Sequence, residues 1–377
     1  MRNLLHSLTL FCLLVSSALV NASDFKVLFI NPGHPDGDNT GSFWSRVSLF
    51  MQAASKDLDV ELVQLYAMRD HLLMKKLAQS APDHKPDYVI VVNEKGVGLE
   101  LLETLTAFNI PTFALLNSFP LDDLNQLSSA QKAKFIGSVV PDNYAAGKSQ
   151  LKTLLSLHSD QYNRNDNYTL LALRGDHSSP AALEREQGML AQLSESQNIT
   201  LAYSPVANWS RQEAYNIVRG LLNRQRIDLI WSANDAMAFG ASKAIAEADL
   251  DYQVTIGGVN WDLAQENPTI DVSFGGHVTL GAKALVMLSD YHHRIAAPCE
   301  MHQLLDIFKA SQADNIERFN INTSAENVDK FDFTRFSKRH GSVAKFTMDT
   351  FVTEEYQALT QSELSNRCQL NTVKKVQ

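Results

Sequence analysis

The sequence predicts an α/β protein with two lobes, each a parallel sheet that carries helices on both faces. Apolar segments of strand length alternate with amphipathic helical segments at a spacing of roughly 30 residues, which is typical of a parallel sheet. A polar stretch, residues 120–134, interrupts this alternation before it resumes, so we expect a second lobe. Residues 229–250 show the repeating unit most clearly, as an apolar strand, a polar turn and a helix.

The first half of the chain predicts four strands and three helices. In the first helix Val47, Phe50, Met51, Ala54 and Leu58 fall on one face, as expected for a helix that packs on a sheet. A polar loop rich in glycine and proline, residues 31–42, precedes this helix. The expected strands are 26–30, 60–65, 88–92 and 111–116, and the expected helices are 43–58, 68–79 and 99–108.

The second half repeats the pattern from a seam near residues 137–143. Its expected strands are 135–139, 168–173, 199–204, 228–231, 254–259 and 272–274, and its helices are 142–157, 181–193, 211–222, a segment after Asp235, and 280–292. Beyond Ala297 the pattern weakens, although 304–308 favours a strand. Residues 324–377 are polar with scattered phenylalanines, which favours a C-terminal extension packed partly on one lobe.

The first 22 residues are typical of a secretory signal peptide. Arg2 supplies the basic end, residues 8–15 the apolar core, and Val20, Asn21 and Ala22 a small-residue cleavage site. The apolar run is shorter than the ~20 residues of a membrane-spanning helix. We therefore expect a mature chain that starts near Ser23 and is soluble outside the cytoplasm.

The charge balance and the cysteines limit the partners and the cross-links. The formal charge of −9 becomes −10 without the signal peptide, because only Arg2 is charged there, and an acidic surface disfavours nucleic acid and anionic membranes. Cys299 and Cys368 remain; in an oxidising compartment they could pair, or both could be free buried thiols.

Several motifs of catalysis and cofactor binding are incomplete. Residues 146–149, AGKS, lack the earlier glycine of a phosphate-binding loop, and residues 257–258 lack the third glycine of a dinucleotide site. The sequence contains neither G-x-S-x-G nor H-E-x-x-H. His34, Asp36 and Asp38 alternate as metal ligands could, but a solvated loop is the better interpretation. We expect no cofactor, no metal and no catalytic residues.

Polar and aromatic side chains follow the predicted strands instead. Aromatic faces stack on the apolar faces of sugar-like rings, while amides and carboxylates bond to hydroxyl groups. Two alternatives stay open: Phe43 and Trp44 could be core residues, and Asn234 and Asp235 could simply cap a helix. The strand-end candidates are Phe43, Trp44, Asn117, Asn234, Asp235, Asn260 with its neighbours Trp261 and Asp262, and His277.

Six segments in order resemble the type I periplasmic solute-binding proteins, the ribose- and galactose-binding family, over residues 26–308. They are SFWSRV (42–47), IGSVVPDNYAAG (136–147), LEREQGM (183–189), SANDAMAFGASKAI (232–245), GGVNWD (257–262) and GGHVTLGAKAL (275–285). The resemblance implies two Rossmann-like lobes joined by a three-crossover hinge, with the ligand in the cleft. It divides the chain into an N-terminal lobe (24–138 and 276–303), a C-terminal lobe (139–275 and 304–323) and an extension (324–377).

The resemblance also assigns roles to the candidate residues. Phe43 and Trp44 match the stacking aromatics, and Asn234 or Asp235 matches a hydrogen-bonding position. Asn117 and Asn260 stand where the family often has acids, and His277 lies near the last polar position. Arg185 is included as a ligand-binding candidate, although it matches a more structural arginine and the family's ligand-binding arginine is replaced by Leu183. These losses argue against ribose and favour a ligand with fewer hydroxyls, or one held through other loops.

The expected function is that of a monomeric periplasmic receptor for a small sugar-like ligand. It would serve a membrane ABC importer, or a sensor kinase or cyclase, and the long first loop and extension favour signalling. One alternative is a secreted hydrolase of small glycosides, with Asp235 and Asp262 as its pair of carboxylates. Another is a LacI-like repressor, which the export signal disfavours.

Overall fold

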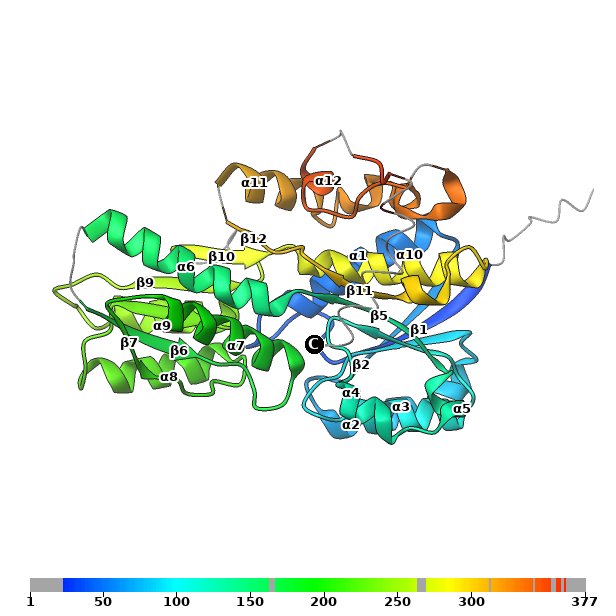
Figure 1. Cartoon of the computed structure of the whole chain (residues 1–377), viewed down its shortest axis with the longest axis horizontal. Helices are drawn as coiled ribbons and strands as arrows, with labels where there is room; N and C mark the ends of the chain where they lie inside the picture. The colour runs from blue at the N-terminus through cyan, green and yellow to red at the C-terminus, as the bar shows by residue number, and fades with distance from the viewer. Residues whose placement is uncertain are drawn as a thin grey trace, which may run out of the picture.

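The computed structural model describes residues 23–162, 167–262, 269–311, 313–341, 343–353, 357–360 and 363. The predicted signal peptide and Cys368 lie outside these residues. Two lobes stand side by side, and the C-terminal segment (residues 313–352) begins above the second lobe and lies mostly over the first (Figure 1). This confirms the predicted fold class of two α/β lobes with largely parallel sheets.

The first lobe is a six-stranded sheet in which all neighbouring strands are parallel, in the order β11-β5-β4-β3-β1-β2. One face carries α1 and α10, which share the largest core cluster with the C-terminal segment, and the other face carries α2 and α3. The strands are β1 (Phe25–Asn31), β2 (Val60–Tyr66), β3 (Tyr88–Val91), β4 (Thr112–Leu115), β5 (Phe135–Pro141) and β11 (His302–Leu305); the helices are α1 (Phe43–Asp57), α2 (His71–Gln79), α3 (Gly98–Ala107) and α10 (Leu280–His292).

The polar stretch that interrupts the alternation contains two short helices, α4 (Leu121–Gln126) and α5 (Ser129–Lys132). Ser128 caps α5 by accepting a hydrogen bond from the backbone N–H of Gln131. Three-residue and four-residue 3₁₀ turns occur elsewhere in the chain, namely η1 (Ala81–His84), η3 (His277–Thr279), η4 (Pro298–Met301), η5 (Val328–Lys330), η6 (Phe333–Phe336) and η7 (Lys338–His340).

The second lobe is also six-stranded, in the order β12-β10-β9-β8-β6-β7, with only the short edge strand β12 antiparallel. Its helices pack in two pairs, α6 with α7 and α8 with α9. The strands are β6 (Tyr168–Leu173), β7 (Ile199–Tyr203), β8 (Leu229–Ser232), β9 (Thr255–Val259), β10 (Val272–Gly275) and β12 (Lys309–Ala310); the helices are α6 (Asn143–Tyr162), α7 (Pro180–Glu195), α8 (Arg211–Leu222) and α9 (Asp235–Ala246).

The chain passes between the lobes after β5, after β10, and between β11 and β12. The predicted boundaries at 138/139 and 303/304 need correction, because they fall inside β5 and β11. These two strands pair in parallel register from Ser138 with His302 to Pro141 with Leu305. Both therefore belong to the first sheet as far as their carboxyl ends. Of the strand predicted at 304–308, only Leu304 and Leu305 lie in a strand, at the end of β11, and β12 follows at Lys309–Ala310 in the other lobe.

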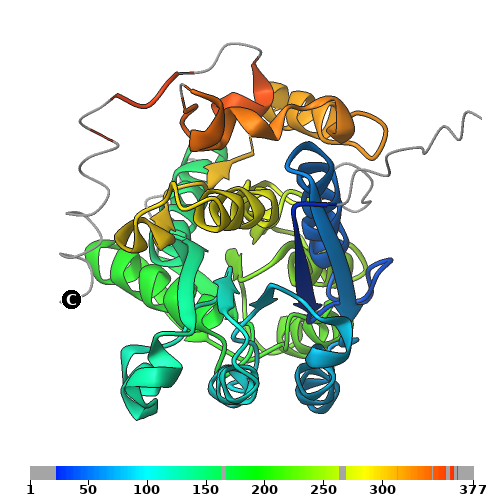
Figure 2. The same cartoon turned by 90° about the vertical axis from the view of Figure 1, so that its right-hand side faces the viewer.

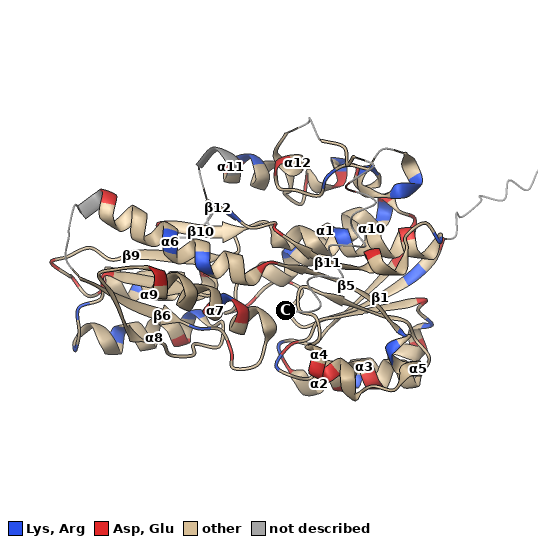
Figure 3. Cartoon of the chain, viewed as in Figure 1, with Lys and Arg blue, Asp and Glu red and all other residues tan. Residues whose placement is uncertain are grey.

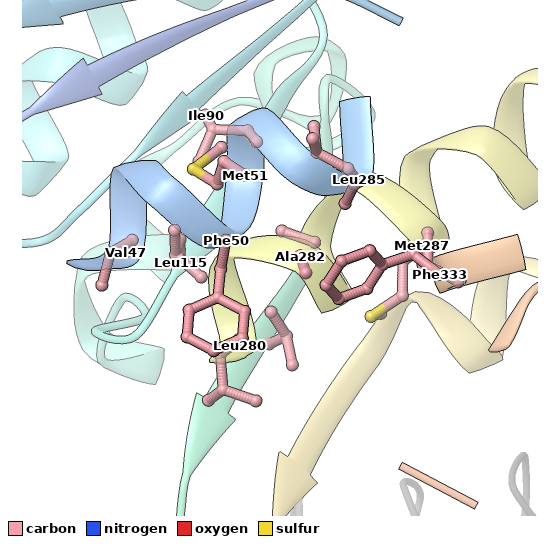
Figure 4. Close-up of a cluster of buried hydrophobic side chains, with 14 of the residues drawn as sticks. Val47, Phe50, Met51, Ile90, Leu115, Leu280, Ala282, Leu285, Met287 and Phe333 are labelled. Carbon is pink, nitrogen blue, oxygen red and sulfur yellow. The ribbon is translucent and has the colours of Figure 1, made fainter. Parts of the chain in front are cut away.

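The C-terminal segment lies against the first lobe (Figure 2). Buried aromatic rings make this contact. Its helices are α11 (Ala313–Asn322) and α12 (Asp349–Val352). In Figure 4, Phe333 of this segment lies with Phe50 of α1 and with Leu280 and Met287 of α10. Residues 313–323 were predicted to belong to the second lobe. Ile316 and Phe319 bury their side chains in the core cluster of the first lobe, which also includes Trp261 of the second lobe.

Candidate ligand-binding site

The carboxyl ends of the parallel strands face a cavity between the two lobes. The non-atom space of this cavity, including the part that opens to solvent, amounts to about 550 Å³. Residues of both lobes form its wall, as expected for a ligand held between them. The lining residues are Thr40, Phe43, Trp44, Arg69, Glu94, Leu116, Asn117, Pro141, Asn143, Ala181, Arg185, Trp209, Asn234, Asn260 and His277.

Aromatic rings cover one side of the cavity. Phe43 and Trp44 occupy the first turn of α1, with their ring centroids 5.0 Å apart in an edge-to-face arrangement. The Phe43 ring stacks on His277 at 4.6 Å. Trp44 is 9% exposed and belongs to the core cluster as well as to the cavity wall, so packing and cavity lining are combined in one side chain.

Trp209, which the sequence interpretation missed, adds a third ring from the second lobe. Its indole N–H donates to Asp176 Oδ2 at 2.8 Å, and its backbone adopts a left-handed φ of 63°. Several bonds to Ser178 and Ser179 and the bond from Trp209 lower the pKa of Asp176 despite its burial. The ring is thereby fixed at the cavity wall.

An ion pair in the first lobe was also missed. Arg69 Nη2 lies 2.6 Å from Glu94 Oε1, and both side chains are largely buried. Burial raises the pKa of Glu94, and the Arg69 charge opposes this shift. The two residues come shortly after β2 and β3, so their position at strand ends was the available signal; their pairing depends on the adjacent loops.

Asn117 and Arg185 line the cavity, as do the other strand-end candidates apart from Asp235, Trp261 and Asp262. Asn117 Oδ1 accepts a hydrogen bond from Ala181 N of the other lobe at 3.0 Å. Arg185 donates to Asn143 Oδ1 at 3.0 Å and to the Ala233 carbonyl at 2.6 Å. Its guanidinium lies between the rings of Trp209 and Phe308, and burial lowers its pKa to about 10.

The protonation of His277 follows from its contact with Arg185. Arg185 Nη2 lies 3.3 Å from His277 Nε2. Because a guanidinium can only donate, Nε2 accepts and the proton resides on Nδ1. Burial first, and then the Arg185 and Arg46 charges, lower the pKa of His277 well below its usual value. His277 is therefore neutral at physiological pH.

Asn234 and Asn260 combine structural bonds with a place in the cavity wall. Asn234 caps α9 by accepting from Met237 N at 2.9 Å, and its amide donates to the Trp209 carbonyl at 3.1 Å. Capping and cavity lining, posed as alternatives in the sequence, therefore occur together at this residue. Asn260 has a positive φ of 140° and donates its backbone N–H to the Phe274 carbonyl.

Asp235, like Trp261 and Asp262, is a strand-end candidate that does not line the cavity. Its carboxylate accepts from Ser273 Oγ at 2.8 Å and from Asp262 N at 2.8 Å, away from the cavity wall. Burial, and then the Asp262 charge, raise the pKa of Asp235 to about 8. Asp235 is the first residue of α9, and its carboxylate is taken up by Ser273 and the Asp262 backbone, so it does not serve as one of two catalytic carboxylates in the cavity.

The remaining candidates involve metals and the cysteines. His34 pairs with Asp38 at 3.2 Å in the first loop, and the described part of the chain contains no cluster of three or more His, Cys, Asp or Glu that could hold a metal ion. Cys299 is disulfide-bonded, while Cys368 lies outside the described residues.

The lobes touch on both sides of the cavity. Ser42 Oγ donates to Asp262 Oδ1 at 2.9 Å, and Arg211 N donates to the Asn39 carbonyl at 3.0 Å. On the other side Lys95 N donates to Ser179 Oγ at 3.2 Å. The structure is therefore a closed arrangement of the two lobes. Such a fold and cavity define a type I periplasmic solute-binding protein.

Comparison with known proteins identifies the family. Residues 35–267 match the model of the periplasmic binding protein domain, so the chain belongs to this family, whose members bind solutes and are not enzymes. A periplasmic sugar-binding protein from Pseudomonas fluorescens is 30% identical, with a TM-score of 0.77, over 87% of this chain and 100% of that chain. The hydrolase alternative is thereby wrong.

Two proteins of lower sequence identity are also binding proteins. A xylitol-binding protein from Mycolicibacterium smegmatis is 25% identical, and the match spans 52% of this chain and about half, 53%, of that relative. An arabinose-transporter binding protein from Shewanella sp. ANA-3, solved with arabinofuranose, is 19% identical over 80% of this chain and 96% of that chain, and its TM-score of 0.65 shows the shared fold.

Proposed function

We propose that this protein captures a small, neutral, polyhydroxylated ligand, a monosaccharide or a sugar alcohol, in the cavity between its lobes. The observation that carries the proposal is the composition of the cavity wall. The same cavity is lined by rings from both lobes, Phe43, Trp44 and Trp209, and by amides, Asn117, Asn234 and Asn260. Rings bind the C–H faces of sugars, and amides both donate to and accept from hydroxyl groups.

The charged groups of the wall favour a neutral ligand. Arg69 and Glu94 compensate each other, and three protein acceptors hold Arg185. A hydroxyl can donate to the Glu94 carboxylate and accept from a guanidinium, so a diol satisfies both partners without bringing a net charge into a buried site. The sugar-binding and xylitol-binding relatives support this ligand class.

Closure of the lobes links capture to a partner. A ligand that contacts both lobes binds the closed form better, and it shifts the hinge equilibrium by that difference in affinity. We infer that the closed surface is recognised by an ABC permease or by a sensor kinase or cyclase in the membrane. The receptor would be a periplasmic monomer, exported with cleavage near Ala22. None of the helices described is long and apolar enough to cross a membrane.

Thermal-shift measurements with xylitol, L-arabinose, D-allose and D-fructose test the proposal, followed by isothermal titration. A ligand at 100 times its Kd should stabilise the fold by about 2.7 kcal/mol. Trp44→Ala should remove this shift, because it deletes a ring of the cavity wall, whereas the exposed Leu190→Ala should keep it. No stabilisation by any neutral sugar or polyol, combined with binding of an anionic solute, would contradict the proposal.

A further inference from the structure

The C-terminal segment contacts the loop that carries Asn260 into the cavity. The ring of Phe319, on α11, lies 5.1 Å from the ring of Trp261 and 6.1 Å from that of Phe50. Phe50 belongs to α1 of the first lobe, whereas Trp261 follows β9 of the second lobe. Phe319 is fully buried between them. One ring of the segment thus touches both lobes directly behind a cavity-lining residue.

Arg46 connects the first lobe, the second lobe and the C-terminal segment. It extends from α1, donates to the Trp261 carbonyl at 3.1 Å, and donates to Asn320 Oδ1 of the C-terminal segment at 3.3 Å. Its guanidinium also lies 3.8 Å from Asp262 Oδ1 and 5.6 Å from the centre of the Phe319 ring. Asn320 is therefore the acceptor that orients a first-lobe guanidinium toward the second-lobe loop.

The segment also packs against the passage between lobes that follows β10. At Gly275 the Trp261 ring leaves no room for a Cβ atom, and at Gly276 Met348 of the segment does the same. Gly276 has a φ of 116°, a conformation that favours glycine. A rotation of the second lobe about this passage must move Trp261 and Gly276 against Phe319 and Met348.

We propose that Phe319, Asn320 and Met348 are positioning residues of the binding site, and that they hold the 260–262 loop and the Gly275–Gly276 passage against the first lobe. The segment then favours the closed form and raises ligand affinity without touching the ligand. This proposal rests on the proposed function, because it assigns the segment a role in the same site.

The primary test is Asn320→Ala, with Phe319→Leu as a second variant. The matched control is Asn327→Ala, whose amide bonds to Ile321 O and Lys330 stay within the C-terminal segment. Xylitol, L-arabinose, D-allose and D-fructose are titrated individually into each variant. Asn320→Ala should bind its sugar about tenfold more weakly, since a charge-assisted bond that supports closure is lost, and Asn327→Ala should bind like the wild type.

Small-angle scattering of the ligand-free proteins supplies the second measurement. Asn320→Ala and Phe319→Leu should have a larger radius of gyration than Asn327→Ala, because the closed form is less populated. If the wild type binds no sugar, the proposed function fails, and the scattering still tests the role of the segment. Unchanged affinity and an unchanged radius, even with a lowered Tm, would reduce the segment to a support of the first lobe and overturn the inference.

Discussion

At the scale of residues, the buried charges around the cavity determine how the fold responds to pH. The pKa of Asp235 is about 8 in the native state, where its carboxyl is buried beside Asp262, and near the ordinary 3.8 in the unfolded chain. Between these values the native state binds more protons, so its stability falls as the pH rises. Asn at this position would remove the ionisation and keep the acceptor for Asp262 N.

We therefore expect Asp235→Asn to be more stable than the wild type at pH 8, by about 1 kcal/mol or more, and to lose this advantage toward pH 4. Urea unfolding at several pH values measures the difference. Parallel stability curves for the two proteins would show that the Asp235 carboxyl is ionised in the fold.

His277 has the opposite effect on how the stability of the fold changes with pH. Its native pKa lies well below 6.5, so in acid the unfolded state takes up the proton first and stability declines as the pH falls through about 6.5. His277→Gln keeps an acceptor for Arg185 but does not titrate. Asp235 contributes equally in the two proteins, so the difference between them isolates His277. Relative to the wild type, the unfolding free energy of His277→Gln should rise by about 1 kcal/mol between pH 7 and pH 5. A difference that does not change with pH would assign the acid sensitivity to other groups.

Variants of the Arg69–Glu94 pair can distinguish a contribution to stability from a contribution to sugar binding. Glu94→Gln leaves a buried guanidinium without its counter-charge and should cost about 3 kcal/mol of unfolding free energy. Adding Arg69→Gln should restore much of this loss, because the lone charge is gone, but sugar affinity should remain about tenfold reduced. Urea unfolding and isothermal titration on the same variants distinguish the effects. Wild-type sugar affinity in the double variant would show that the pair does not contribute to sugar binding.

At the scale of elements, the contact between α6 and α7 places Arg185. Gly188 of α7 packs on the Tyr144 carbonyl, and Gly147 of α6 packs on the Arg185 carbonyl, so neither position has room for a Cβ. The helices approach closely only because these two residues are glycines. Arg185 reaches the cavity from a helix whose position is set in this way.

Gly188→Ala should therefore force the helices apart, destabilise the fold by about 1–3 kcal/mol and weaken sugar binding through Arg185. Gly220 in α8 is the matched control, because nothing lies within 4 Å of a Cβ built there. Gly220→Ala should stabilise the protein by about 0.5–1 kcal/mol and leave binding unchanged. Thermal unfolding and titration of both variants check the pair.

At the scale of the whole molecule, the closed cavity predicts a change of shape. The interlobe bonds at Ser42, Asn117 and Lys95 form only when the lobes meet, and a ligand in the cavity favours that state. Scattering should show a smaller radius of gyration with a bound sugar than without it. A radius that does not change with a sugar at saturating concentration would contradict closure.

Acidic and basic residues are mixed over the whole molecule. Lysine and arginine are interspersed with aspartate and glutamate over both lobes in Figure 3, and the net formal charge of the chain is −9. Charge of this sign and distribution supports solubility more than binding to nucleic acid.

The sequence by itself determined the alternation of strands and helices, the two lobes, and the strand-end positions of Phe43, Asn117, Asn234 and His277. These features follow from local periodicity, and the carboxyl ends of parallel strands meet at one edge. Even the limits of α8 and α10, residues 211–222 and 280–292, agree with the pattern of apolar residues.

Only the tertiary structure decided which strand-end residues meet, and how. It paired Arg69 with Glu94, turned Asp235 toward Ser273, extended β5 and β11 to the lobe edge, and placed Phe319 on the first lobe. Each of these outcomes depends on distances between segments far apart in the chain. Periodicity shows which face of an element is apolar, but it does not show which distant partner will cover that face.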